Sequence, residues 1–163
     1  YVMRHSKSSW NEPNISDFQR SLSSKGRKDI KFIIKFLKKK KIKFDFAYIS
    51  SSKRTKQTFK LLKMKIKIEK ELFSKKLYLS DADKIFNIIK KTKKNYKNIL
   101  IVNHEPTCKN LVSKLIKKNY FLFKEKKFST SGIAKITFPI KKWKKLKECS
   151  GKLVFFKRPI DLI

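Results

Sequence analysis

The chain has 163 residues and a formal net charge of +33 at pH 7, from 45 Lys and Arg against 12 Asp and Glu. This length suits one domain with a sizeable core and is short for two, so we expect a single domain over residues 1–163 with a truncated N-terminal strand. No apolar run approaches the roughly 18 residues of a membrane span, which indicates a soluble protein without a membrane partner.

The first half of the sequence alternates strand and helix patterns. An apolar stub at Tyr1–Met3 is typical of the end of a buried strand, and a polar loop follows it. Apolar residues at helical spacing predict a helix over 24–41, and the segment FDFAYIS at 44–50 is rich in the aromatic and β-branched residues of strands. A second helix is expected over 53–63, and the alternation over 65–73 predicts an edge strand.

The pattern continues in the second half. Asp81 is a candidate N-cap for a helix over 83–93, and NILIVN at 98–103 is the clearest buried strand of the chain. Pro106 suits the first position of the next helix, which continues to Ile116.

The two closing strands, over 133–139 and 152–156, have no helix between them, so we expect an antiparallel hairpin at one edge of the sheet. Strands that alternate with helices imply parallel βαβ units and a sheet covered on both faces. The sequence therefore predicts an α/β fold, a three-layer α/β/α sandwich with a mostly parallel central sheet and an antiparallel edge.

Most of the basic residues are lysines, so an arginine or a histidine tells more about function than a lysine does. Forty of the 45 are Lys, spread over every segment and mostly on the polar faces of the expected helices. A dedicated nucleic-acid binder would concentrate Arg and aromatic residues in one patch, so we attribute the charge to compositional bias and expect no specific nucleic-acid partner. A retained Arg then indicates a need for a planar bidentate donor, as in phosphate recognition. The arginines and histidines are Arg4, Arg20, Arg27, Arg54, Arg158, His5 and His104.

Three of the expected strands end in such residues. Arg4 and His5 follow the first strand, Arg54 opens the helix after the second, and His104 follows the buried strand at 98–103. The carboxyl ends of parallel strands share one edge of a sheet, where open α/β folds bind their ligands. Two arginines and two histidines suit phosphoryl transfer: the arginines hold the oxygens, one neutral imidazole attacks phosphorus and the other donates a hydrogen bond. Taken singly, each residue also suits an ordinary turn, cap or surface position.

Cysteine usage argues against a metal site. Cys108 and Cys149 stand apart, and no Cys or His cluster has the spacing of metal ligands. We expect free thiols in a reducing cytoplasm, with neither a bound metal nor another cofactor.

Four segments resemble the motifs of the histidine phosphatase superfamily, in the correct order over nearly the whole chain. They are Val2–Ser8, Ser50–Thr58, Ile101–Pro106 and Phe128–Ala134. Within the superfamily they are most similar to the small SixA-type phosphohistidine phosphatases. The resemblance implies a phosphoglycerate-mutase-like fold. It also implies a metal-independent phosphatase that removes phosphate from a phosphorylated protein histidine, for example on a histidine phosphotransfer domain.

The resemblance implies roles for individual residues as well. His5 would be the phosphorylated nucleophile, Arg4 and Arg54 would clamp the phosphate, and His104 would be the second histidine of the pocket. Weaker correspondences extend substrate binding to Lys7, Arg20, Thr130 and Ser131.

The sequence departs from the superfamily at three points. Ser6 stands for the usual glycine after the nucleophile, and Asn103 for the glycine before the second histidine. The long insertion that carries a general acid in phosphoglycerate-mutase-like relatives is missing, and no carboxylate in the corresponding stretch is an obvious proton donor. Two alternatives stay open: a small-molecule phosphomonoesterase of the same superfamily, and a non-catalytic basic module that binds RNA or acidic protein.

Overall fold

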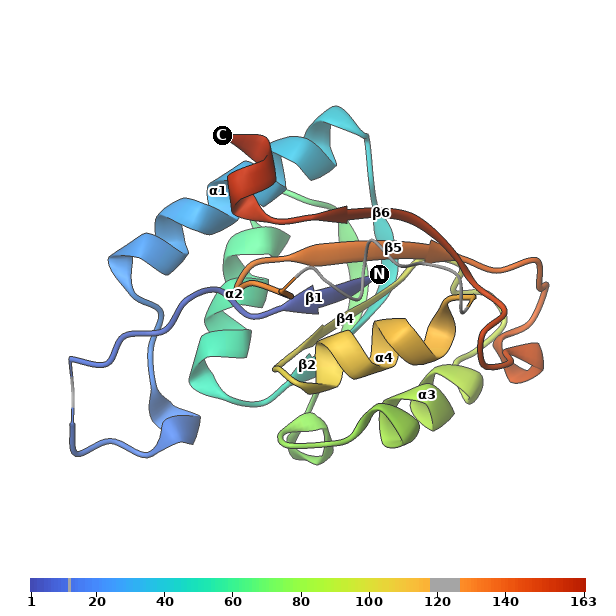
Figure 1. Cartoon of the computed structure of the whole chain (residues 1–163), viewed down its shortest axis with the longest axis horizontal. Coiled ribbons are helices and arrows are strands. Elements are labelled where there is room, and N and C mark those ends of the chain that lie inside the picture. The colour runs from blue at the N-terminus through green and yellow to red at the C-terminus, as the bar shows by residue number, and fades with distance from the viewer. Residues whose placement is uncertain (12, 118–126) are drawn as a thin grey trace.

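The computed structural model describes residues 1–11, 13–117 and 127–163. Six strands form one sheet in the order β3-β2-β4-β1-β5-β6 (Figure 1). The strands are β1 (Val2–Arg4), β2 (Phe44–Ser50), β3 (Ile68–Ser74), β4 (Ile99–Asn103), β5 (Ile133–Thr137) and β6 (Lys152–Lys157). The α-helices are α1 (Ser24–Lys39), α2 (Lys53–Lys63), α3 (Ala82–Lys90) and α4 (Thr107–Leu115), and the short 3-10 helices are η1 (Asp17–Gln19), η2 (Lys75–Leu77), η3 (Trp143–Lys145) and η4 (Pro159–Leu162).

The four strands β1 to β4 run parallel, with β4 between β1 and β2 and with β3 at the edge. The β5–β6 hairpin is antiparallel and closes the other edge through pairing of β5 with β1. The predicted α/β fold, with a mostly parallel sheet and an antiparallel edge, is therefore confirmed.

Two apolar cores lie on opposite faces of the sheet, because successive strand residues point to opposite sides. In β4, Ile99 and Ile101 belong to the core beneath α3 and α4, whereas Leu100 and Val102 belong to the core beneath α1 and α2. All five residues of β4 are buried. This explains why the segment shows an unbroken apolar run rather than alternation.

Helix ends differ slightly from the predicted ones where the backbone turns. Helix α1 ends at Lys39, because Lys41 adopts a left-handed conformation with φ of 52° and the Ile42 amide donates to the Leu37 carbonyl oxygen at 3.0 Å. The predicted N-cap of α3 is present, since the Asp81 carboxylate accepts from the Lys84 amide at 2.7 Å. Pro106 lies one position before α4 rather than inside it.

The loop that follows β1 packs directly on the first turn of α1. At Gly26 a Cβ atom would overlap the Lys7 carbonyl oxygen, so only glycine permits this approach. The Ser23 side chain caps α1 by accepting from the Gly26 amide at 3.0 Å. This packing fixes the chain just after Arg4 and His5. Among the described helices, none is long and apolar enough to cross a membrane.

Candidate active site

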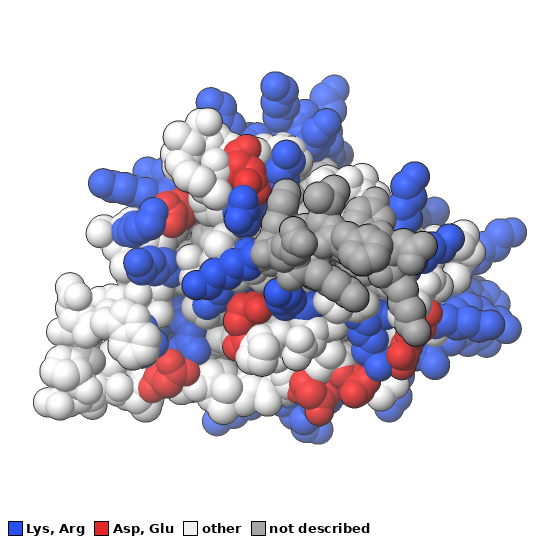
Figure 2. All heavy atoms as spheres, in the orientation of Figure 1, with Lys and Arg blue, Asp and Glu red and all other residues white. Residues whose placement is uncertain are grey.

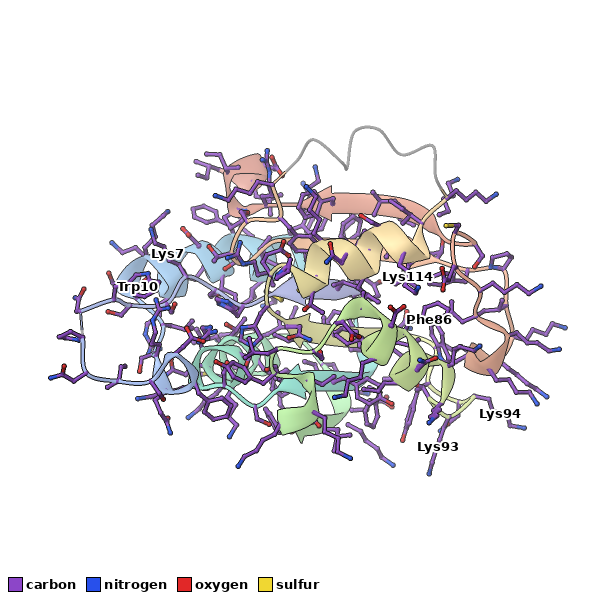
Figure 3. All side chains as sticks on the ribbon, turned by 60° about the horizontal axis from the view of Figure 1, so that its bottom comes forward. Lys7, Trp10, Phe86, Lys93, Lys94 and Lys114 are labelled. Carbon is purple, nitrogen blue, oxygen red and sulfur yellow. The ribbon has the colours of Figure 1, made fainter. Side chains whose placement is uncertain are left out.

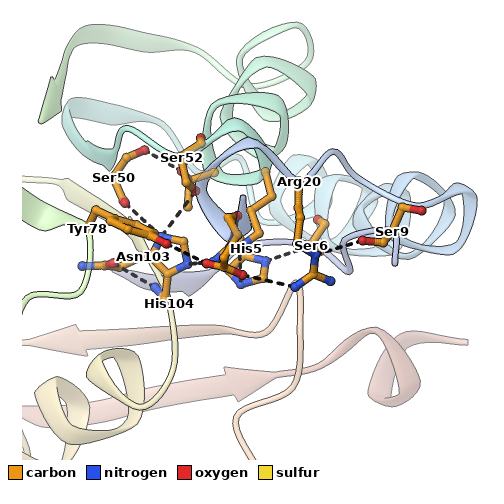
Figure 4. Close-up of polar contacts among 12 residues, drawn as sticks. His5, Ser6, Ser9, Arg20, Ser50, Ser52, Tyr78, Asn103 and His104 are labelled. Carbon is orange, nitrogen blue, oxygen red and sulfur yellow. Dashed lines mark hydrogen bonds and ion pairs between the residues drawn. The ribbon is translucent and has the colours of Figure 1, made fainter. Parts of the chain in front are cut away.

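The parallel strands β1, β2 and β4 bring the predicted site residues to one edge of the sheet. Arg4 pairs with Asn103 in the β1–β4 ladder, and the His5 amide donates to the Asn103 carbonyl oxygen at 2.9 Å. Consequently the two imidazoles that follow these strands lie side by side, with ring centroids of His5 and His104 4.9 Å apart (Figure 4). Arg54 enters from the first turn of α2, which follows β2.

One nitrogen of the His5 imidazole carries the proton and the other presents its lone pair. Its Nδ1 lies 2.7 Å from the Ser6 carbonyl oxygen, and a carbonyl can only accept, so Nδ1 carries the proton and Nε2 the lone pair. The ring is 7% exposed, and burial lowers its pKa to about 3, with the charges of His104, Arg54 and Arg4 acting in the same direction. At neutral pH, His5 is therefore a neutral nucleophile with a defined attacking nitrogen.

The second imidazole, His104, lies between Arg54 and a serine at the end of β2. Its Nε2 is 2.9 Å from Ser50 Oγ, and its Nδ1 is 3.2 Å from Arg54 Nη2. Because a guanidinium only donates, Nδ1 accepts and the proton of the neutral ring lies on Nε2, facing the Ser50 hydroxyl. Burial and then the charge of Arg54 lower the pKa of His104 to about 3. The Asn103 side chain fixes the backbone here by accepting from the His104 amide at 2.9 Å.

Arg54 connects the two rings. Its side chain is 7% exposed, and its Nε lies 3.3 Å from His5 Nε2 while its Nη2 reaches His104. The same guanidinium donates from Nη1 to the Asp17 carbonyl oxygen and from Nη2 to the Asp17 carboxylate at 2.8 Å. A cation thus lies against both imidazoles, where a phosphoryl group attacked by His5 would carry its negative charge.

Arg4 supplies a second positive charge next to the imidazoles. Its Nη1 donates to the Phe128 carbonyl oxygen at 2.8 Å, whereas its Nε is buried without a hydrogen-bond partner among the described residues. A buried donor without a partner costs free energy, and a bound oxyanion would satisfy it.

Ser6, which stands where the superfamily usually has glycine, has hydrogen-bond partners in the structure. The Ser6 side chain is fully buried, its hydroxyl accepts from Ser131 Oγ at 2.7 Å, and its amide donates to Thr58 Oγ1 at 2.9 Å. The Ser131 amide in turn donates to the His5 carbonyl oxygen at 3.1 Å. The Ser6 hydroxyl therefore ties the nucleophile loop to the turn before β5.

The weaker predicted binding residues surround this cluster rather than enter it. Lys7 is exposed and, with Trp10, lines a hollow of about 560 Å³ beside the nucleophile loop; Figure 3 shows both at the same end of the molecule. Thr130 is half-buried in the turn before β5. Arg20 is buried, donates from Nε to the Ser9 carbonyl oxygen at 3.0 Å and pairs with Asp17 at 3.2 Å. Substrate contacts of these residues stay predictions.

The structure adds residues that the sequence did not indicate. The Tyr78 hydroxyl donates to the Asp17 carboxylate at 2.7 Å, and the Tyr78 ring lies edge-on to His104 with centroids 5.4 Å apart. Ser50, which faces His104, belongs to the Ser50–Thr58 motif. The three consecutive serines at 50–52 could therefore have indicated it as a site residue. Tyr78 lies in an unremarkable stretch after the edge strand, and no pattern there indicates a site.

Two carboxylates lie near the histidines, and their pKa values are shifted in opposite directions. Burial alone would raise the pKa of Asp17, but the hydrogen bonds from Tyr78 and Arg54 and the charge of Arg54 hold it at about 2. Burial raises the pKa of Glu105, whose Oε1 accepts from the Lys109 amide at 3.0 Å. Within the described ranges, no three His, Cys, Asp or Glu side chains gather as metal ligands.

Comparison with known proteins supports the resemblance. Residues 1–74 match the model of the histidine phosphatase superfamily, branch 1. The superfamily resemblance drawn from the sequence motifs is thereby confirmed. No curated protein matches the chain in sequence.

Solved structures share the fold over nearly the full chain. A protein assigned as the phosphohistidine phosphatase SixA from Agrobacterium tumefaciens has a TM-score of 0.80 at 21% identity, covering 97% of this chain and 96% of its own. A protein histidine phosphatase SixA complexed with tungstate has a TM-score of 0.84 at 20% identity, with coverage of 99% and 97%. A third, assigned as SixA from Nakamurella multipartitia, has a TM-score of 0.82 at 18% identity, with coverage of 98% and 95%. The superfamily match supports phosphatase activity, and these neighbours show that the fold is shared.

The buried neutral histidines predict a pH-dependent stability. In the unfolded chain a histidine has a pKa of about 6.5, whereas His5 and His104 have pKa values of about 3 in the fold. The unfolded state then binds more protons between these values, so stability should fall as the pH drops from about 6.5 towards 3. Urea unfolding at several pH values measures this slope. A His5→Asn, His104→Asn variant should show a shallower slope, and an unchanged slope would contradict the assignment.

Proposed function

We propose that the chain is a metal-independent phosphohistidine phosphatase that forms a covalent phosphohistidine intermediate on His5. One observation carries the proposal: His5 holds a proton on Nδ1 against the Ser6 carbonyl oxygen and presents Nε2 to Arg54, which also contacts His104. This arrangement combines a neutral nucleophile with a cation at the place where charge develops on a phosphoryl group.

The proposed reaction has two balanced steps. In the first, His5 Nε2 attacks phosphorus while the bond between phosphorus and the substrate imidazole breaks, and the leaving imidazole takes a proton from solvent. In the second, water attacks phosphorus, the electron pair of the Nε2–phosphorus bond returns to His5, and phosphate and a proton leave. Arg54 and Arg4 would stabilise the phosphoryl oxygens in both steps.

A protein substrate with an acidic surface suits the charge of this molecule. Lys and Arg side chains project along the top and the right of the view in Figure 2, while Asp and Glu form small separate clusters and the lower left is mostly uncharged. Opposite charge raises the rate at which partners meet and suppresses other partners. A phosphohistidine on an acidic protein of the cytoplasm is therefore the substrate class that we propose.

A parallel assay tests the function. The protein should release phosphate from a phosphohistidine protein, more slowly from an aryl phosphate and least from sugar phosphates, and EDTA should leave these rates unchanged. A loss of activity in EDTA that Mg²⁺ or Zn²⁺ restores would contradict metal independence. Absence of turnover, with salt-dependent binding to RNA instead, would support the binding-module alternative.

Arg54 gives a second test through its shape rather than its charge. Arg54→Lys keeps the charge but loses the planar fork that reaches both imidazoles, so kcat/KM should fall by at least roughly tenfold. Arg27→Lys makes the same replacement at an exposed position of α1 and should leave kcat/KM unchanged. Equal tolerance at both arginines would contradict a clamp at Arg54.

A further inference from the structure

The guanidinium of Arg54 directs its two forks at different partners. One fork, from Nε and Nη2, faces the imidazoles, with Nε 3.3 Å from His5 Nε2 and Nη2 3.2 Å from His104 Nδ1. The other fork, from Nη1 and Nη2, faces Asp17, whose carbonyl oxygen and carboxylate both accept. Because the five N–H donors of arginine have a fixed planar geometry, holding one fork sets the direction of the other.

Asp17 is itself held by donors from two other segments. The Tyr78 hydroxyl donates to Oδ2 at 2.7 Å, and Arg20 Nη1 donates to Oδ1 at 3.2 Å. Arg20 also donates to the Ser9 carbonyl oxygen at 3.0 Å, as Figure 4 shows, and its guanidinium lies 3.1 Å from the centre of the Trp10 ring. The carboxylate therefore sits in a fixed position although half of its side chain is exposed.

The fork that Asp17 holds is not the fork that a phosphoryl group needs. A phosphoryl group between His5 and His104 would meet Nε and the inner side of Nη2, while Asp17 holds Nη1 and the outer end of Nη2. Asp17 can thus keep its contacts when phosphate binds. It also gives the buried Arg54 charge a fixed counter-charge, without which burial of that charge would be costly.

We propose that Asp17, anchored by Tyr78 and Arg20, is a positioning residue that aims the Nε–Nη2 fork of Arg54 at a phosphoryl group held between His5 and His104. The inference rests on the proposed function, because it assumes that an oxyanion occupies the space beside the two imidazoles. It assigns Arg20 to the support of Asp17.

Turnover and oxyanion binding together test the proposal. Asp17→Asn removes the charge with little change in size, and the misaimed fork should lower kcat/KM by roughly 10- to 100-fold, as small displacements of a catalytic group do. Tungstate, an oxyanion of similar shape to phosphate, should bind more weakly to this variant by calorimetry. Asp29→Asn is the matched control, since Asp29 pairs with Lys25 within α1 and its replacement should leave both readouts unchanged.

A double-mutant cycle separates positioning from a merely structural role. If Asp17 acts through Arg54, Asp17→Asn should have little further effect in an Arg54→Lys background, whereas independent roles would give multiplied losses. Tyr78→Phe keeps the ring and removes one donor to Asp17, so it should lower kcat/KM by a smaller factor, and it serves if Asp17→Asn fails to fold.

Two outcomes would overturn the positioning role of Asp17, and a third would refute the proposed function alone. Unchanged kcat/KM and unchanged tungstate affinity in both variants would overturn the proposal. Tighter tungstate binding in Asp17→Asn would also overturn it, because Asp17 would then compete with the oxyanion for Arg54. A wild-type protein that binds tungstate but turns over no phosphate ester or phosphoramidate would refute the proposed function alone, and the tungstate affinities of the variants would still judge the positioning role.

Discussion

Replacement of His5 by alanine should reduce turnover by about 10⁴-fold or more, as removal of a covalent nucleophile does in other enzymes. The second imidazole of the site, His104, does not replace it in this geometry, because its Nε2 carries the proton and faces the Ser50 hydroxyl. The measurement is the rate of phosphate release from a phosphohistidine protein by purified wild type and variant. Circular dichroism and the urea midpoint of each protein establish that the variant is folded.

Lys38→Ala lies on α1, away from the site, and controls for losses of activity during expression and purification. This variant should retain full activity. Residual activity of His5→Ala near the wild-type level would remove His5 as the nucleophile. The two-step reaction would then have to be abandoned.

The rate should depend strongly on the leaving group, with phosphohistidine and phosphoramidate first, aryl phosphates next and alkyl phosphates last. A general acid typically contributes about 10² to 10⁴ in rate, mostly for poor leaving groups. The leaving imidazole of phosphohistidine has a conjugate-acid pKa of roughly 6.5, so it departs with little help. At neutral pH, Asp17 cannot supply a proton, because hydrogen bonds from Tyr78 and Arg54 outweigh its burial and hold its pKa at about 2. We therefore expect kcat/KM for an alkyl phosphate at least roughly 100-fold below that for phosphohistidine.

Comparable kcat/KM for alkyl phosphate and phosphohistidine would mean that an acid is present. Glu105 would then be the residue to test, since it follows His104 and burial raises its pKa. A selective loss of alkyl phosphate turnover in Glu105→Gln would identify it as the donor. That result would favour the small-molecule phosphomonoesterase alternative.

Sequence periodicity predicts the sheet and its helices because the two apolar cores impose it residue by residue. The alternation of Leu100 and Val102 with Ile99 and Ile101 between the cores marks β4 as central. The parallel order of β1, β2 and β4 then places His5, Arg54 and His104 at one edge without any knowledge of side-chain contacts. Helix ends were less predictable, because a single left-handed residue such as Lys41 ends α1.

The support of Arg54 could not be predicted in the same way. Asp17 lies 37 residues before Arg54 and 61 before Tyr78, and no short-range pattern records these contacts. They arise where the segments that hold Asp17 and Tyr78 meet the first turn of α2, and loop conformations follow from tertiary packing rather than from periodicity. The sequence therefore indicates which residues do the chemistry more readily than which residues aim them.

Direct detection of the phosphoenzyme tests the central claim. Wild-type protein mixed rapidly with a phosphohistidine or phosphoramidate substrate and quenched in base should carry one added phosphoryl group by intact mass. Peptide mapping should place that group on His5, and it should be lost in acid. The central claim would be contradicted by steady turnover with no phosphoenzyme at any quench time, or by an acid-stable phosphoryl group on one of the serines at the end of β2.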